Sequence, residues 1–225
     1  MKTITITTHN RPQYLRKVIE CLRIAISHTD TDYHLVAGVE PGCEDSLSQI
    51  ESIDFIPVTI IKNKKKLGVR NNPHNLLKYV FETMNSDMNV YMEDDVIISP
   101  DALQMADWFF TQDTEYFSLQ YFNRTRNNPN NLTDLIEINP IEFSALSFVL
   151  KRKNWNNLKS MWYLHKKGWD YSVCNNLDKK MITPSFSRSN HIGREGTYMV
   201  PKIQDQFYTD RQMCEVPGPF EYKIQ

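Results

Sequence analysis

The chain has 225 residues, 40% of them hydrophobic and 12% aromatic, a composition that suits a globular domain with a sizeable core and not a disordered protein. Its formal net charge of −1 excludes a global positive field that would draw it onto nucleic acid or an anionic membrane. Apolar stretches such as residues 96–98 are far shorter than the roughly 20 residues of a membrane-spanning helix, and the N-terminus lacks a signal-peptide core, so we expect a cytoplasmic protein with no membrane span.

The first half of the chain alternates strand and helix patterns. Strands are predicted over residues 3–8, 33–39, 56–61 and 89–92. Asn10 is expected to cap a helix that has Pro12 in its first turn. The apolar stripes of two helices are Leu15, Val18, Ile19, Leu22 and Ile26, and then Leu76, Leu77, Val80, Phe81 and Met84. This alternation predicts an α/β fold with a mostly parallel central sheet flanked by helices.

The second half of the chain is more mixed. Residues 99–101 (SPD) begin a helix with a capping hydroxyl, a proline at the first position and an acid in the first turn. Strand patterns follow at 117–122 and 145–150, separated by the polar loop 127–131. No repeat, low-complexity segment or linker interrupts the sequence. We therefore predict one domain, residues 1–225, with a mixed C-terminal half.

Three acids in succession, Glu93, Asp94 and Asp95, follow the fourth predicted strand. Ligands of open α/β sheets collect at the carboxyl ends of the strands, where residues 7–11 and 40–42 are also expected. Adjacent carboxylates repel one another, and a divalent cation would relieve that repulsion because hard cations prefer oxygen ligands. A solvated acidic turn ahead of a helix explains the same letters. The three acids alone leave both interpretations open.

A basic run, Lys62, Lys64–Lys66 and Arg70, follows the third predicted strand. It admits three interpretations: a solvated strand end, a neighbour of bound phosphates, or a patch for an anionic acceptor. Residues 71–73 continue into the next helix, whose N-terminal amides could also face an anion.

Two later segments are candidates for a site. Asp170 follows Trp169 and could act as a general base set in an aromatic wall, although a surface or capping role is the plainer interpretation. Residues 185–196 are polar, contain two glycines and show no helical or strand period. They fit a plain surface loop, or a lid whose Arg188, His191 and Arg194 reach a phosphate.

Taken together, these segments resemble a glycosyltransferase of the GT-A fold over roughly residues 3–210. Residues 7–15 (TTHNRPQYL) resemble the opening of that superfamily, and 91–101 (YMEDDVIISPD) is similar to the acid-acid-acid form of its DXD motif. The segments 168–170 (GWD) and 187–193 (SRSNHIG) resemble the catalytic-base region and following loop of the N-acetylglucosaminyltransferase I family and its O-mannose-linked relative. Glu40 stands where the superfamily usually has an aspartate near the base or ribose.

The resemblance implies a metal-dependent, inverting transfer of a sugar from a nucleotide-sugar, with a UDP-sugar favoured. Residues 1–100 would form the nucleotide-sugar half, and 101–225 the acceptor half, with a mobile loop at about 187–200. Mn²⁺ (or Mg²⁺) would be bound mainly by Asp95, with His191 as a second ligand. Asp170 would take the acceptor proton. The donor-binding residues that we expect are Thr7, His9, Arg11, Glu40, Arg70, Glu93, Asp94, Arg188, His191 and Arg194.

The acceptor and two alternative functions stay open. The chain resembles a catalytic core alone, which suggests a bacterial or virus-infected cytoplasm and a glycan, a protein or a hydroxymethylated DNA base as the acceptor. DNA would require the basic run, Arg124 and Arg126 to form one stripe beside the site. A nucleotidyltransferase would need a glycine-rich loop where residues 9–12 (HNRP) stand. A nucleotide-binding pseudoenzyme would keep the fold without the reaction.

Overall fold

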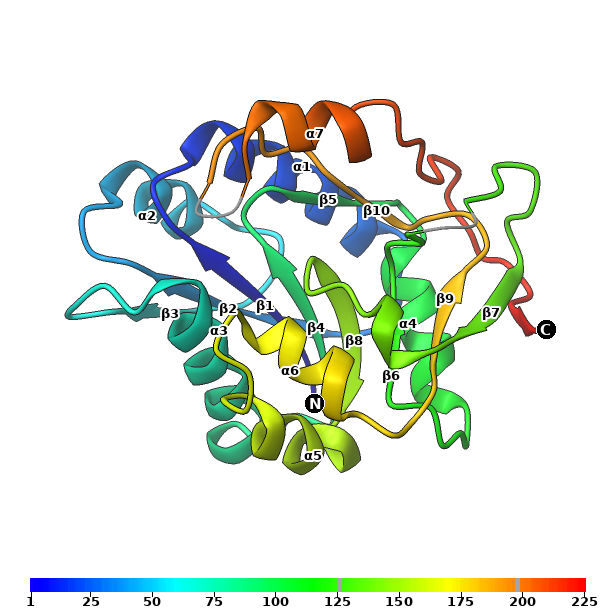
Figure 1. Cartoon of the computed structure of the whole chain (residues 1–225). Helices are drawn as coiled ribbons and strands as arrows, with labels where there is room; N and C mark the ends of the chain where they lie inside the picture. Colours follow the sequence, from blue (N-terminus) through cyan, green and yellow to red (C-terminus); the bar gives the residue numbers. More distant parts are fainter. Residues whose placement is uncertain (125–126, 197–198) are drawn as a thin grey trace.

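The computed structural model describes residues 1–124, 127–196 and 199–225 (Figure 1). Its first half follows the predicted alternation of strand and helix. The elements are β1 (Lys2–Thr8), α1 (Pro12–Ser27), β2 (Tyr33–Val39), α2 (Glu44–Glu51), β3 (Val58–Lys62), α3 (Gly68–Lys78) with a π-helical turn at Tyr79–Thr83, and β4 (Met88–Glu93).

The second half holds shorter elements. They are β5 (Val96–Ile98), α4 (Ala102–Thr111), β6 (Ser118–Gln120), β7 (Asp134–Ile138), β8 (Ser147–Lys151), α5 (Trp155–Met161), α6 (Trp169–Asn176), β9 (Met181–Pro184), β10 (Ser189–His191), α7 (Pro201–Phe207) and β11 (Lys223–Ile224). Single 3₁₀ turns lie at Pro140–Glu142 and Arg152–Asn154.

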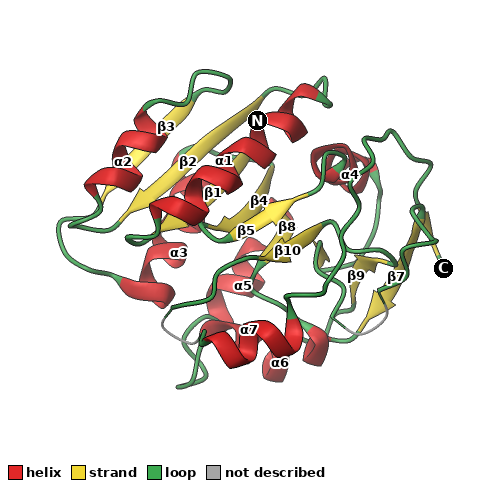
Figure 2. Cartoon of the chain, turned by 90° about the horizontal axis from the view of Figure 1, so that it is seen from above, coloured by secondary structure: helices red, strands yellow, loops and turns green. Residues whose placement is uncertain are grey.

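The central sheet has the order β11-β7-β9-β6-β8-β4-β1-β2-β3. Strands β4, β1, β2 and β3 run parallel, whereas β8 is antiparallel to both β4 and β6. The remaining pairs are of both kinds, so the C-terminal half is mixed, as predicted. A separate antiparallel pair joins β10 to β5 (Figure 2). The predicted fold class is therefore confirmed.

Helices cover both faces of the sheet, and each face has its own core. Helices α1, α2 and α4 pack on one side, while α3, α5 and α6 pack on the other (Figure 1). Strand β4 shows the alternation behind this arrangement: Met88, Val90 and Met92 join the first core, and Tyr91 joins the second. Strands buried on both faces are typical of the parallel part of such sheets. In the part of the chain that the structure describes, every helix is too short or too polar to cross a bilayer.

Three local predictions were wrong. Helix α1 begins after Arg11 and not after Asn10, which has a positive φ of 47° and makes no cap. The Ser99 hydroxyl donates to the Asp101 carboxylate at 2.6 Å and does not cap α4. In the polar run 185–196, the short strand β10 forms because β5 offers a pairing edge, although the local sequence shows no strand period.

Candidate active site

The site lies where the chain connections leave the sheet in opposite directions, at the carboxyl ends of β1 and β4. Thr7 and Glu93 are partners in the parallel β1–β4 register. The segments that follow Thr7 and Glu93 therefore leave the sheet next to each other. The first contains Arg11, and the second begins with Asp94 and Asp95. This is the position at which doubly wound sheets bind ligands.

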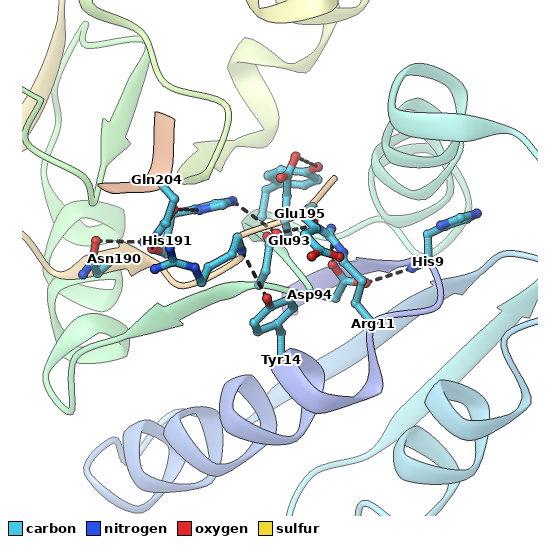
Figure 3. A network of polar contacts seen from close by, with 12 residues as sticks. His9, Arg11, Tyr14, Glu93, Asp94, Asn190, His191, Glu195 and Gln204 are labelled. Atoms are coloured by element: carbon cyan, nitrogen blue, oxygen red, sulfur yellow. Dashed lines mark hydrogen bonds and ion pairs between the residues drawn. The ribbon is translucent and has the colours of Figure 1, made fainter. Parts of the chain in front are cut away.

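Arg11 bridges the two aspartates of the acid run. Its Nη2 donates to Asp94 Oδ1 and its Nη1 to Asp95 Oδ2. The second oxygen of Asp94 accepts the backbone N–H of His9 at 2.8 Å, while the His9 ring points away from the acids (Figure 3). Asp94 and Asp95 are both fully buried. A buried pair of carboxylates at the end of β4 is thus compensated by one cation from the β1–α1 turn.

Burial and charge set the ionisation of this cluster. Burial raises the pKa of Asp94 to about 6, against the opposing effect of Arg11. Burial, followed by the charge of Asp95, also raises the pKa of Glu93. For Asp95 burial acts in the same direction, but the hydrogen bond and charge of His191 outweigh it and lower the pKa. Burial lowers the pKa of His191, but the hydrogen bond and charge of Asp95 act in the opposite direction and raise it overall.

The last residue of β10 and the segment that follows it pack directly onto Asp95. His191 Nε2 lies 3.1 Å from Asp95 Oδ2, and His191 Nδ1 lies 3.0 Å from Gln204 Oε1 of α7. The Ile192 N–H donates to the Asp95 carbonyl at 2.9 Å. A Cβ on Gly193 would lie 2.2 Å from Asp95 Oδ2, so glycine allows the loop to approach this closely. Of the predicted mobile loop 187–200, residues 197 and 198 lie outside the described residues.

A cavity of about 1060 Å³ opens beside the acids and extends across the sheet to α6. Nine of the predicted site residues line it: Thr7, His9, Arg11, Glu40, Arg70, Glu93, Asp95, Asp170 and His191. Asp94 does not, because it lies buried behind Arg11. The structure therefore brings the N-terminal, acidic, Asp170 and His191 segments to one cavity although they are far apart in the sequence.

Two of these lining residues are also engaged with backbone groups. The Glu40 carboxylate accepts the N–H groups of Leu67 at 2.9 Å and Gly68 at 2.7 Å, at the start of α3. The Arg70 guanidinium donates to the carbonyls of Trp162 at 3.3 Å and His165 at 2.5 Å. Each side chain fixes a loop at the cavity rim, a contact that the sequence did not indicate.

Two predicted donor residues lie elsewhere. Arg188 is fully buried, donates to Asp101 Oδ2 at 2.7 Å and stays outside the cavity lining, so the expectation that it reaches a phosphate is corrected. Its carboxylate partner explains the burial, since a buried charge requires a paired one. Arg194 pairs on the surface with Asp205 at 2.8 Å and is likewise absent from the lining among the described residues.

The Arg188–Asp101 pair predicts a large stability effect. Arg188→Met leaves the Asp101 carboxylate buried without its counter-charge, so urea unfolding should show a free energy of unfolding lower by about 3–5 kcal/mol. Arg194→Met is the matched control, because its exposed ion pair is worth about 1 kcal/mol or less. Adding Asp101→Asn to Arg188→Met should restore part of the loss. Equal stability of the two single variants would contradict the role of the buried pair.

The far end of the cavity is formed around α6. Asp170 lies in the first turn of α6, half-exposed, next to Trp169. The Trp169 ring stacks on Trp162 at 4.2 Å with an interplanar angle of 6°, and also contacts Tyr91 edge-on. These rings form the aromatic wall that the sequence suggested, and they pack the start of α6 against β4.

Sequence reasoning missed several lining residues. Tyr208 packs its ring 5.1 Å from the His191 ring and 5.4 Å from the Phe122 ring, which connects the two ends of the cavity. Lys166 and Lys167 also line the cavity, as does Arg124, which the sequence suggested only for a DNA-binding stripe. No motif marks Tyr208, whereas the adjacent lysines precede the GWD segment and could have been noticed. Lys66, Arg70 and Arg124 share the cavity, but Arg126, also needed for a DNA-binding stripe, lies outside the described residues.

The acid run has one carboxylate oxygen available to a divalent cation. Asp95 Oδ1 is buried and has no hydrogen-bond partner among the described residues, so one carboxylate oxygen is free to take a ligand. Those residues offer no ready group of three His, Cys, Asp or Glu ligands. Mg²⁺-like ions are commonly held by one or two carboxylates together with substrate phosphates. The carboxylate oxygens of the site are therefore suitable ligands for such a cation.

The parallel sheet, the acids at the end of β4 and the cavity define the GT-A fold class. A family model, described as glycosyltransferase like family 2, matches residues 2–176. The chain belongs to this family. A search of curated proteins finds no match.

Solved structures show the same fold at low sequence identity. Staphylococcus aureus TarS with UDP-GlcNAc is 12% identical (TM-score 0.63; 88% of this chain, 60% of that one). Mannosyltransferase PcManGT from Pyrobaculum calidifontis with GDP-Man and Mn²⁺ is 14% identical (TM-score 0.59; 81% and 54%). A197 from STIV is 12% identical (TM-score 0.51; 96% and 98%). The chain thus spans 60% of the TarS 1–349 chain but 34% of the longer TarS chain, 54% of the PcManGT chain and 98% of the A197 chain.

Proposed function

We propose that this protein is a metal-dependent, inverting glycosyltransferase that moves a sugar from a nucleotide-sugar, preferably a UDP-sugar, to an acceptor hydroxyl. One observation carries the proposal: Glu93 and Asp95 at the end of β4 and Asp170 at the start of α6 line the same cavity. Family membership supports the reaction class. Neighbours with bound UDP-GlcNAc or GDP-Man support a nucleotide-sugar donor.

The donor end would bind the nucleotide-sugar through Thr7, His9, Arg11 and Arg70, with Asp95 and His191 holding Mn²⁺ or Mg²⁺. When bound, the cation would neutralise the charge that develops on the leaving nucleotide. Both His191 ring nitrogens have partners in this structure, so binding through this ring would replace one of those contacts. Asp95 is therefore the principal ligand in the proposal.

The acceptor end would supply the base. Asp170 lines the cavity, and neither a hydrogen bond nor an ion pair from the described residues engages its carboxylate. A free carboxylate can take the proton of an attacking hydroxyl. Attack from the side opposite the departing nucleotide would invert the anomeric carbon. The proposed acceptor is a glycan, a protein or a hydroxymethylated DNA base. The proposed setting is the cytoplasm of a bacterial or virus-infected cell. The narrower resemblance to N-acetylglucosaminyltransferase I is also part of this proposal.

The test is a thermal-shift panel of UDP-, GDP-, CMP- and dTDP-sugars, each with Mn²⁺ and with EDTA. One nucleotide is expected to raise Tm by roughly 5–10 °C at a concentration 100-fold above its Kd, and only with Mn²⁺. The selected sugar nucleotide should also be hydrolysed slowly without an acceptor. Absence of any shift would contradict donor binding, and binding without hydrolysis or transfer would favour a pseudoenzyme.

A further inference from the structure

The acceptor end of the cavity carries three cationic side chains that the proposed reaction does not use. Arg124 follows β6, and Lys166 with Lys167 precedes α6; all three are exposed and line the cavity. Within the described chain, none of the three forms an ion pair, whereas surface lysines nearby, such as Lys159 and Lys180, do pair with glutamates. Three cations outside any ion pair therefore line the same cavity as the Asp170 carboxylate.

Lys166 and Lys167 precede Asp170 by four and three residues, and Arg124 lines the same cavity. Lys167 Nζ lies 5.6 Å from the centre of the Tyr171 ring, the residue next to Asp170. The Cys174 thiol lies one turn after Asp170, and its pKa is raised chiefly by burial and further by Asp170, whereas Arg124 lowers it. The charges of Asp170 and Arg124 thus act on the same thiol. The cations and the proposed base share one end of the cavity.

Among the described residues, the aspartates of the acid run pair with Arg11 and His191 and with none of these three cations. Arg11 and Asp95 follow the carboxyl ends of β1 and β4, and His191 of β10 contacts Asp95. The Tyr208 ring contacts both the His191 ring and the Phe122 ring, and Phe122 lies two residues before Arg124. The single Asp170 carboxylate cannot neutralise three cations, so a further anion would reduce their mutual repulsion. Arg and Lys are the side chains that bind phosphate and carboxylate groups, Arg through its planar fork and Lys as a point charge.

We propose that the acceptor is anionic, with a phosphate or carboxylate close to the attacked hydroxyl, bound by Arg124, Lys166 and Lys167. The inference rests on the proposed glycosyl transfer, since it names the substrate class of the same site. The exposed Tyr171 ring, stacked on His165 at 5.4 Å and 17°, offers a flat face for the neutral part of such an acceptor. In this proposal the three cations select an anionic acceptor, and Asp170 takes the proton of the acceptor hydroxyl.

The test compares matched probes on protein saturated with the nucleotide selected by the thermal-shift panel. Binding is measured by ligand-detected NMR, and transfer is measured with radiolabelled donor. One series compares glycerol with glycerol 3-phosphate, and the other compares glucose with glucose 6-phosphate and glucuronate. The charged member is expected to be preferred roughly ten- to hundredfold, as for hydrogen bonds to charged groups. The phosphate and glucuronate arms show which anion is used. The preference should weaken as salt is added.

Lysine variants make the test specific. Lys166→Gln with Lys167→Gln should reduce the preference at least about tenfold and leave donor binding unchanged. Lys64→Gln with Lys65→Gln is the control, because these adjacent exposed lysines lie outside the cavity lining. Equal binding of charged and neutral probes, no binding of the charged probes, or the same result for both double variants would overturn the inference. The absence of a nucleotide-dependent Tm shift in the wild type would instead contradict the proposed function.

Discussion

Asp170→Asn is expected to bind the donor as the wild type does and to transfer the sugar about 10²–10⁴ times more slowly, the usual contribution of a general base. Asparagine keeps the shape of the side chain but cannot accept a proton. Asp170 makes no hydrogen bond or ion pair with the rest of the described chain, so its substitution should leave the fold unchanged. Single-turnover transfer at saturating donor, together with a donor titration, measures the two effects separately.

Asp178→Asn is the matched control for this prediction. Asp178 is an exposed acid that follows α6 and lies outside the cavity lining. Its variant should transfer sugar at the wild-type rate. If Asp170→Asn also turned over at nearly that rate, the base would have to be sought elsewhere in the cavity. A parallel loss of donor affinity would instead assign Asp170 to binding.

The fold could be predicted because its signals are local. The stripe from Leu15 to Ile26 became the core-facing side of α1, with Leu15, Val18 and Leu22 fully buried. The four N-terminal strands follow from short apolar runs between those helices. The parallel order then brings Thr7 beside Glu93 without any further information from the sequence.

The partners within the site could not be predicted, because they are set by residues far apart in the chain. Arg11 contacts acids more than 80 residues away, and Arg188 contacts Asp101 at a separation of 87 residues. An arginine in a polar run is typical of a surface loop, so the burial of Arg188 has no local signal. The contacts of Glu40 also have no local signal, because its carboxylate accepts hydrogen bonds from backbone amides and no sequence pattern identifies these partners.

Asp95→Asn is expected to lose Mn²⁺-dependent binding of the donor. Asp95 is the member of the acid run with both a free buried oxygen and a place in the cavity lining. Replacing it removes a charged oxygen ligand, and since even partners of metal ligands contribute about 10- to 100-fold in affinity, the loss should exceed about tenfold. Titrating UDP in the presence of Mn²⁺ and of EDTA measures it: the two values should differ in the wild type and coincide in the variant.

Asp94→Asn separates this effect from a general disturbance of the acid run. Asp94 is equally buried and also bonds Arg11, but its second oxygen is held by the His9 amide and it lies behind the cavity. Its variant should unfold more easily because the Arg11 contact weakens, yet keep the difference between Mn²⁺ and EDTA. Unchanged UDP affinity with Mn²⁺ in Asp95→Asn would remove Asp95 from the metal site. Loss of the Mn²⁺ effect in both variants would mean that the Arg11 clamp as a whole, and not the Asp95 carboxylate, shapes the donor end.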